Sequence, residues 1–398
     1  MHVLICSVSS SRQPSGICRH AANLARCLAE RREITRITLL LGQWQIRYFV
    51  SALALGCPKL QVVSVDLHYG ALARNIWYLR RLPAVINGYA PDIIHLSFPL
   101  PFLRGSVACP VVTSLHDLYP YDMPENFGHH RAVFNRLFLR QCLRNSASIV
   151  CSSDFTLSRL RSLVPQIATG KAIRIYQSVY FKAGVSEELS VPDLHKGSFV
   201  LCVAQHRRNK NLDLLLAGFS ELRQRGGRLE AMNLVIVGGP GPETAHLKHV
   251  VRQLLLQRKV VFLAAVADAT LLWLYQNSEL LVATSSIEGF GLPIIEALQC
   301  GTRVVCSDIP VFREIAGDAV RYFNLHSASP ATELANAMVA ASHDPSPEPE
   351  ALDQFRSSAV AEQYLSLYSQ LLATRGLHNV GEVPELLDAD ITYDGLPG

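Results

Sequence analysis

Short apolar runs alternate with amphipathic helical patterns along most of the chain. In the first half, runs rich in β-branched residues predict strands at residues 3–8, 37–41, 61–65, 92–96, 111–115, 148–151 and 172–176. Apolar positions at helical spacing predict helices at residues 17–31 and 131–145. Strands that alternate with helices in this way indicate a parallel sheet with helices on both faces.

The alternation begins again after a polar segment at residues 181–196, where Gly, Ser, Glu, Pro and Asp cluster with little periodicity. Beyond this segment we expect strands at residues 199–204, 233–238, 260–263, 280–284, 304–307 and 319–323, and helices at residues 212–223, 244–257, 270–276 and 294–299. The fold class is therefore predicted to be α/β, with two doubly wound domains in series. Ligands of such sheets bind beyond the carboxyl ends of the strands, so we expect the site in a cleft between two such edges.

The pattern also predicts where the domains begin and end. We place the first domain at residues 1–183, the linker at 184–197 and the second domain at 198–350. A polar, Pro-rich break precedes a last long helix, predicted at residues 351–375. Residues 376–398 contain acidic side chains but no Lys or Arg, which predicts a loose acidic tail.

Composition narrows the class of protein. A chain of 398 residues is too long to fold around one ordinary hydrophobic core, which favours two domains. A content of 49% hydrophobic and 18% charged residues is typical of a globular protein. The net charge of +4 does not favour a nucleic-acid partner. The apolar runs are too short for a membrane span, and the first residues resemble a strand more than a signal peptide. Ten scattered cysteines without C-x-x-C spacing indicate reduced thiols, so we expect a cytoplasmic protein.

The strongest chemical motif lies at residues 285–301, where a Gly-bearing loop follows an apolar strand. Pro293 is expected at a first helical position and Gly301 just past the end of that helix. Such a helix start offers free N–H groups and a positive dipole end to an anion. Glu288 in the loop and Glu296 one turn into the helix suit hydroxyl groups instead. Together these features predict a site for a molecule that is both a phosphate and a polyol, namely a nucleotide-sugar.

Two further segments are expected at the same cleft. Arg207, Arg208 and Lys210 follow the first strand of the second domain, where fixed positive groups suit a diphosphate. His116 and Asp117 end a strand of the first domain. Taken alone, this pair is better explained as a turn histidine capped by Asp117. Asp117 fits equally a helix N-cap or a partner that orients the imidazole.

The motif at residues 285–301, with its continuation through residues 301–310 and 313–319, resembles the E-x7-E signature of retaining glycosyltransferases of family four, which have the GT-B fold of two Rossmann-like domains facing across a cleft. The resemblance implies that the first glutamate and the next three backbone units hold the donor sugar. It also implies that N–H groups at the helix start meet the diphosphate and that the second glutamate binds the ribose hydroxyls. The residues concerned are Glu288, Gly289, Phe290, Gly291, Leu292 and Glu296.

The basic loop is similar to the donor-phosphate loop of the family, which ends in Lys-Asn, here Lys210 and Asn211. Many members have an Arg five residues before that Lys, where this chain has Gln205. We expect Arg207 to supply the missing guanidinium.

The resemblance also extends to the first domain. His116 matches the histidine that lies near the transferred sugar and the acceptor. Gly16 matches the glycine-rich first loop, although a second glycine is absent, and it is expected to contact the donor. The lack of a G-x-G-x-x-G motif argues against a dinucleotide dehydrogenase. Arg19 and His20, which follow in the same segment, receive no role.

The activity that the resemblance implies is transfer of a hexose, of mannose or glucose type, from a nucleotide-diphospho-sugar to a glycan or lipid-linked acceptor with retention of configuration. The expected setting is synthesis of cell-envelope polysaccharide or glycolipid. His116, Glu288 and Lys210 are the expected catalytic residues. No Asp-x-Asp motif stands in a metal-site context, so we expect neither a divalent metal nor another cofactor. The alternatives are a non-catalytic nucleotide-sugar-binding subunit and another GT-B enzyme such as an epimerase or a phosphorylase.

The helix predicted at residues 131–145 has two interpretations. It carries Arg136, Arg140 and Arg144 at four-residue spacing, with Phe134, Leu137 and Phe138 on another side. The simpler interpretation, which we favour at this point, is a surface helix packed on the sheet. The other is a basic surface, extended by Arg80 and Arg81, that contacts anionic lipid at the cytoplasmic face of a membrane.

Overall fold

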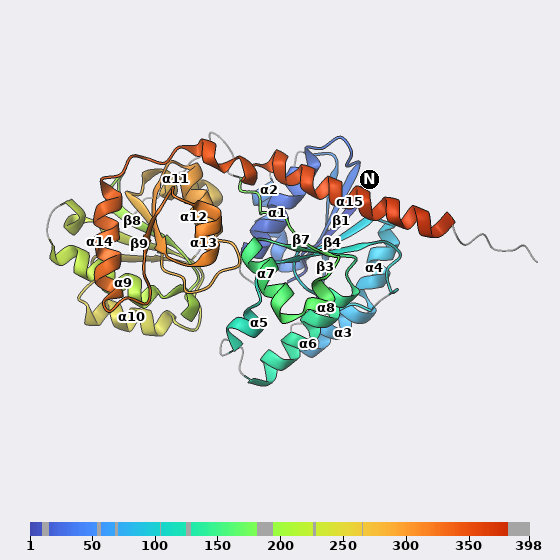
Figure 1. Ribbon diagram of the computed structural model, residues 1–398, viewed down its shortest axis with the longest axis horizontal. Helices are drawn as coiled ribbons and strands as arrows, with labels where there is room; N and C mark the ends of the chain where they lie inside the picture. The colour runs from blue at the N-terminus through green and yellow to red at the C-terminus, as the bar shows by residue number, and fades with distance from the viewer. Residues whose placement is uncertain are drawn as a thin grey trace, which may run out of the picture.

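The computed structural model describes residues 1–9, 16–53, 57–67, 71–103, 105–124, 129–180, 194–225, 228–264 and 266–380. Two α/β units lie side by side, and the last long helix runs across the first of them (Figure 1). One unit contains a sheet of order β3-β2-β1-β4-β5-β6-β7 and the other a sheet of order β10-β9-β8-β11-β12-β13. The strand pairs in both sheets are parallel, so the prediction of two doubly wound domains is confirmed.

The first sheet contains every strand that the apolar runs predict. Its strands are β1 (His2–Cys6), β2 (Arg36–Gly42), β3 (Leu60–Val65), β4 (Ile93–Leu96), β5 (Val111–Leu115), β6 (Ser148–Cys151) and β7 (Ala172–Arg174). Its helices are α1 (Gly16–Ala29), α2 (Ile46–Leu53), α3 (Ala71–Arg80), α4 (Leu82–Tyr89), α5 (Tyr119–Asp122), α6 (His129–Asn145), α7 (Asp154–Leu163) and α8 (Pro165–Ala168). The strand order reverses between β1 and β4, so the carboxyl ends of β1, β4 and β5 border the point where such sheets bind ligands.

The second sheet repeats this plan. Its strands are β8 (Phe199–Val203), β9 (Asn233–Val237), β10 (Val260–Leu263), β11 (Leu280–Ala283), β12 (Arg303–Ser307) and β13 (Arg321–Phe323). Its helices are α9 (Leu212–Gln224), α10 (Thr244–Gln253), α11 (Asp268–Asn277), α12 (Leu292–Gln299), α13 (Pro310–Ala316) and α14 (Pro330–Ser342). Here the strand order reverses between β8 and β11, and both sequence motifs of the second domain leave these two strands.

The end of the chain differs from the prediction of one helix at residues 351–375. A 3-10 segment, η5 (Pro349–Phe355), comes first, and α15 (Ser357–Val380) follows it. Arg356 separates the two because its backbone is extended, with φ −66° and ψ 144°. Residues 376–380 are also helical, not a loose tail. The rest of the predicted tail, 381–398, and most of the predicted linker, 181–193, lie outside the described residues.

The last helix, α15, packs on the first domain. Its buried side chains share one hydrophobic cluster with α1 and with the strands β1 and β2, and they include Val360, Ala361, Tyr364, Leu365 and Tyr368. Among the helices of the described ranges, none is both long enough and apolar enough to cross a bilayer.

A buried hydrogen-bond chain connects α15 with the centre of the first sheet. The Tyr368 hydroxyl lies 2.6 Å from His95 Nδ1, and His95 Nε2 lies 2.8 Å from Ser114 Oγ. Ser114 Oγ in turn lies 3.1 Å from His20 Nε2. Burial lowers the pKa of His95 to about 3, so the ring is neutral and needs one donor and one acceptor. The chain supplies both.

We expect Tyr368→Phe to destabilise the first domain by about 1–3 kcal/mol, because it leaves His95 Nδ1 buried without its hydroxyl partner. Urea unfolding, followed by circular dichroism, measures the change. Tyr89→Phe in α4 is the control and is expected to leave the midpoint unchanged. Equal midpoints for the two variants would show that the Tyr368 hydroxyl contributes nothing.

Candidate functional site

The motif at residues 285–301 connects β11 to α12 as a strand, a loop and a helix start. Gly291 caps α12 with φ 115°, and a Cβ on it would lie 2.9 Å from both Ile315 and Phe312. Only glycine tolerates both conditions. Gly301 follows the helix with φ 70°, as predicted. Pro293 is the second helical residue and not the first, which is harmless because N–H groups of the first turn have no intrahelical partner.

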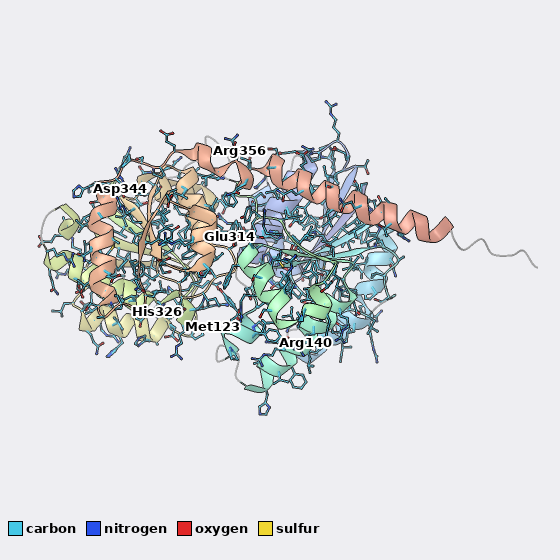
Figure 2. The ribbon with its side chains drawn as sticks, viewed as in Figure 1. Met123, Arg140, Glu314, His326, Asp344 and Arg356 are labelled. Atoms are coloured by element: carbon cyan, nitrogen blue, oxygen red, sulfur yellow. The ribbon has the colours of Figure 1, made fainter. Side chains whose placement is uncertain are left out.

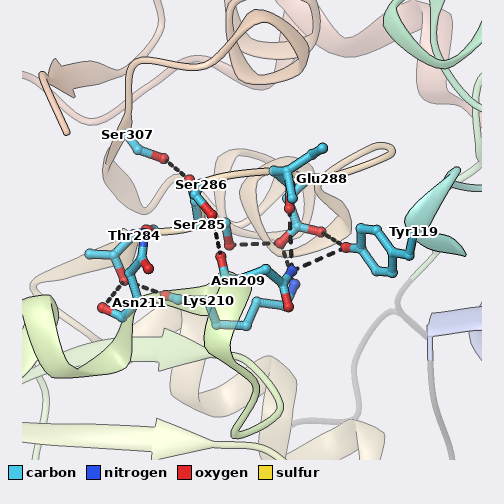
Figure 3. A network of polar contacts seen from close by, with 10 residues as sticks. Tyr119, Asn209, Lys210, Asn211, Thr284, Ser285, Ser286, Glu288 and Ser307 are labelled. Atoms are coloured by element: carbon cyan, nitrogen blue, oxygen red, sulfur yellow. Dashed lines mark hydrogen bonds and ion pairs between the residues drawn. The ribbon is translucent and has the colours of Figure 1, made fainter. Parts of the chain in front are cut away.

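Glu288 is the centre of a polar network between the two domains (Figure 3). Lys210 Nζ forms an ion pair with its Oε1, and Ser285 Oγ donates to the same oxygen over 2.7 Å. From the first domain, the Tyr119 hydroxyl donates to Oε2 over 3.3 Å. Burial and the nearby Glu288 carboxylate keep the pKa of Tyr119 well above its usual value, so this hydroxyl stays a donor. The carboxylate thus binds one cation and two hydroxyls.

The basic loop is tied to the end of β11, and this places Lys210 beside Glu288. Asn211, in the left-handed conformation with φ 46°, donates from Nδ2 to the Thr284 carbonyl over 3.1 Å. Thr284 Oγ1 returns a bond of 2.7 Å to the Lys210 carbonyl. The amide of Asn211 therefore supports the loop through the backbone of the neighbouring strand.

Arg207 and Arg208 are both exposed, and Arg207 acts electrostatically on Asp117 of the first domain. Burial raises the pKa of Asp117 to about 6, and the charges of Arg207 and Lys210 oppose that rise. The Arg207 charge therefore reaches the border between the domains, as expected for a group near the donor phosphates. Its contact with the donor stays a prediction.

Glu296 is almost completely enclosed, with 3% of its side chain exposed. Arg19 Nη1 donates to its Oε1 over 2.7 Å, and the Tyr275 hydroxyl donates to its Oε2 over 2.7 Å. Arg19 belongs to α1 of the first domain, and its Nη2 also contacts Asp268 Oδ1 at 2.5 Å. The carboxylate that is predicted to bind ribose is therefore covered by a cation from the opposite domain.

The backbone of Gly289 lies directly against the first domain. Its carbonyl accepts from Ser152 Oγ at 2.9 Å, from Ser153 Oγ at 2.8 Å and from Thr156 Oγ1 at 3.2 Å. A Cβ on Gly289 would lie 1.5 Å from the His116 carbonyl oxygen, which is impossible without displacing a backbone. Glycine is needed here because two main chains meet without an intervening side chain.

Glu314, on α13 (Figure 2), makes a further contact between the domains. Its two carboxylate oxygens accept the N–H groups of Asp154 at 2.6 Å and Phe155 at 2.9 Å. These groups begin α7, so a carboxylate of the second domain caps a helix of the first.

The remaining motif residues have defined surroundings. The Phe290 ring is buried and packs against Tyr176 and Phe355, so only its backbone is available for a donor. Gly16 faces Leu292 at the start of α12, where a Cβ would make an ordinary 4.0 Å contact. Residues 14 and 15, which precede Gly16 in the first loop, lie outside the described residues.

His116 ends β5 as predicted, and protein atoms engage both of its ring nitrogens. Nε2 donates to the Ser97 carbonyl over 2.7 Å, and Nδ1 lies 3.3 Å from Gln177 Nε2. Burial lowers the pKa of His116 to about 4, so the ring is neutral near pH 7. Asp117 does not orient this ring; it accepts from the Tyr119 N–H at 3.1 Å where α5 begins. A catalytic role for His116 stays a prediction.

A small pocket borders Glu288 between the domains. Its walls include Asp117, Tyr119, Asp122, Arg159, Ile287 and Glu288. Arg159 and Asp122 form an ion pair there. Hydroxyls, carboxylates and a guanidinium, which are groups that bind sugar hydroxyls, therefore meet beside Glu288. Within the described ranges, no three His, Cys, Asp or Glu side chains form a metal-binding cluster.

Both halves of the chain match glycosyltransferase families. Residues 14–177 match the family described as Glycosyltransferase Family 4, and residues 188–359 match the family described as Glycosyl transferases group 1. The chain belongs to the family-four glycosyltransferases of the GT-B fold.

Individual proteins support this assignment. The O-antigen chain mannosyltransferase B of Escherichia coli is 27% identical over 77% of this chain and 82% of its own length. The sucrose-phosphate synthase of Thermosynechococcus elongatus superposes with a TM-score of 0.69 at 18% identity, over 94% of this chain and 99% of that chain. HepE of Anabaena, solved with UDP-glucose, superposes with a TM-score of 0.62 at 18% identity, over 95% and 100% of the two chains. The two structural matches show the fold.

Sequence patterns missed the first-domain groups that complete the site: Arg19, Tyr119, Ser152, Ser153 and Thr156. Arg19 offered a weak signal, since it follows Gly16 by three residues at a helix start. The others offered none, because their role depends on how closely the two domains approach.

We expect Gly289→Ala to separate the domains, because the added methyl group overlaps the His116 carbonyl. The radius of gyration from small-angle scattering should increase, and stability should fall by about 1–3 kcal/mol. Gly88→Ala is the matched control, since a Cβ there meets nothing within 4 Å. An unchanged radius of gyration for Gly289→Ala would contradict the close approach of the two backbones.

Proposed function

We propose that this chain transfers a hexose, of mannose or glucose type, from a nucleotide-diphospho-sugar to a glycan or lipid-linked acceptor, with retention at the anomeric carbon. The carrying observation is the Glu288 carboxylate, held between Lys210 and Tyr119 where the two domains meet. The name of the Escherichia coli relative supports mannose and a role in cell-envelope polysaccharide synthesis, and the UDP-glucose complex of HepE supports a nucleoside diphosphate leaving group. Such donors support an activity in the cytoplasm or at the cytoplasmic face of a membrane.

The chemistry follows from the charges around the loop. Glu288 turns from its protein partners to hydroxyls of the donor sugar, and Lys210 turns to the diphosphate. The start of α12, with the Leu292 N–H group and the positive end of the helix dipole, receives the same phosphates. Lys210, Arg207 and this helix start supply the positive charge for the leaving group, so the proposed reaction uses no divalent metal.

Retention is proposed to proceed on one face of the sugar. The bond from the anomeric carbon to the phosphate oxygen breaks, and the departing diphosphate takes the proton of the acceptor hydroxyl as that oxygen bonds to the same carbon. Glu288 is not proposed as a covalent nucleophile, because its carboxylate is assigned to hydroxyls of the donor sugar. Stabilisation of the leaving diphosphate is then the main catalytic contribution.

We expect Lys210→Ala and Glu288→Gln each to lower kcat/KM by roughly 10²–10³-fold, since each removes a group that acts on the transferring sugar phosphate. A thermal-shift screen with GDP-, UDP- and ADP-sugars selects the donor, and acceptor-dependent release of nucleoside diphosphate measures turnover. Lys248→Ala, an exposed lysine of α10, is the control.

Full activity in both site variants would favour a non-catalytic binding subunit. Conversion of the donor without any acceptor would favour an epimerase. Insensitivity to EDTA is expected if the positive charge of the protein replaces a metal.

A lipid surface is proposed as a further partner. In α6, Val133, Phe134 and Leu137 each expose more than half of their surface, while Leu139 and Leu143 pack inward. The helix contains no acidic residue. Arg140 and Arg144 are exposed on it, as are Arg80 and Arg81 elsewhere. Arg136 does not join them, because its Nε donates to the Pro120 carbonyl over 2.7 Å. Exposed apolar groups flanked by arginines suit an anionic bilayer.

We expect the wild-type protein to float with phosphatidylglycerol-containing vesicles and the double variant Phe134→Ser/Leu137→Ser to lose most of that binding. Leu255→Ser, which removes a highly exposed apolar side chain from the second domain, is the control. No flotation of the wild type, or equal flotation of all three proteins, would overturn this surface.

A further inference from the structure

Arg19 forms an ion pair with Glu296, the carboxylate that is predicted to bind the ribose. Its two terminal nitrogens contact two different carboxylates of the second domain, Glu296 Oε1 at 2.7 Å and Asp268 Oδ1 at 2.5 Å. The three residues come from three elements, α1, α11 and α12. The contact therefore joins the domains at the nucleotide end of the cleft.

The surroundings of Glu296 leave no room for a ribose in this arrangement. Tyr275 holds Oε2 from within the second domain, Arg19 covers Oε1 from the first, and 3% of the Glu296 side chain is exposed. Ribose hydroxyls are donors, as is the guanidinium, so both use the same acceptor. A nucleotide reaches Glu296 only when Arg19 moves away.

Asp268 lets Arg19 leave Glu296 without losing an ionic partner. It is the first residue of α11 and its side chain is 44% exposed, in contrast to the enclosed Glu296. A guanidinium that stays enclosed without a carboxylate partner is costly, because its charge is neither hydrated nor paired. With Asp268 at the edge of the cleft, the guanidinium exchanges two carboxylates for one and stays paired.

We propose that Arg19 sets the affinity for the donor by competing with the ribose for Glu296. In the unliganded protein Arg19 pairs with Glu296 and holds the first domain against the second. When a nucleoside diphosphate binds, its ribose takes Glu296 and Arg19 remains on Asp268. This inference rests on the proposed function, because it takes Glu296 as the ribose carboxylate.

The test compares a nucleoside diphosphate with its 2′,3′-dideoxy counterpart by isothermal titration calorimetry. The nucleotide is the one that the thermal-shift screen selects. The dissociation constant of the dideoxy compound, divided by that of the ribonucleotide, reports how well Glu296 receives the ribose hydroxyls. Arg19→Ala should tighten binding of the ribonucleotide and raise this ratio by roughly 5- to 50-fold, since the competitor is gone. If Arg19 merely supported the fold, its removal would weaken the binding of both ligands alike.

Asp268→Asn is a second variant, which is expected to change the ratio in the opposite direction. Without the second carboxylate, Arg19 stays on Glu296, so the ratio should fall below that of the wild type. A contact of Asp268 with the nucleobase would instead weaken both ligands equally and leave the ratio unchanged. Arg26→Ala is the matched control, because Arg26 lies on the same helix but donates to Asn23 and stacks over Tyr180.

The outcomes separate this inference from the proposed function. If both proteins bind ribonucleotides but the ratio for Arg19→Ala is equal to or lower than that of the wild type, the competition is overturned. The proposed transferase activity is then unaffected. If neither protein binds any nucleoside diphosphate, both are overturned. Binding by Arg19→Ala but not by the wild type would support the competition in its strongest form.

Discussion

The site depends on one close approach, in which the backbone of Gly289 lies against the backbone that follows β5. Because Gly289 has no side chain, its carbonyl reaches three hydroxyls of the first domain. Glu288 precedes it by one residue and is therefore held at the boundary, within reach of Lys210 on one side and Tyr119 on the other. A methyl group at position 289 would move that carboxylate away from Tyr119, its partner in the first domain.

Charge balance in this site is internal. Glu288 is paired within its own domain by Lys210, and Glu296 is paired across the cleft by Arg19. Removing such groups from water is costly, and added hydrogen bonds offset that cost. Ser285 supplies one to Glu288 and Tyr275 supplies one to Glu296. A nucleotide-sugar, with its phosphates and hydroxyls, can exchange with these partners without leaving a charge uncompensated.

Buried histidines lie behind His116 in the first domain. His20, His95 and His116 lie close together, and burial is the main cause that lowers the pKa of each ring. Neutral rings join a hydrogen-bond chain that reaches Tyr368 on α15. The last helix thus supports the first-domain wall of the cleft, although it follows the second domain in sequence.

The sequence by itself determined the two sheets, the strand-loop-helix form of residues 285–301 and the basic loop, because each depends on local periodicity or on glycine and proline at set positions. It missed the helices α2, α3, α4, α5, α7 and α8 of the first domain and α13 and α14 of the second. It also ran η5 and α15 together, because the extended backbone at Arg356 leaves no mark in the hydrophobic pattern. Only the tertiary structure decided which partners the two glutamates have. Arg19 and Glu296 are 277 residues apart, and no local pattern relates them. Their contact exists because two separate sheets meet at the edges where their strands end.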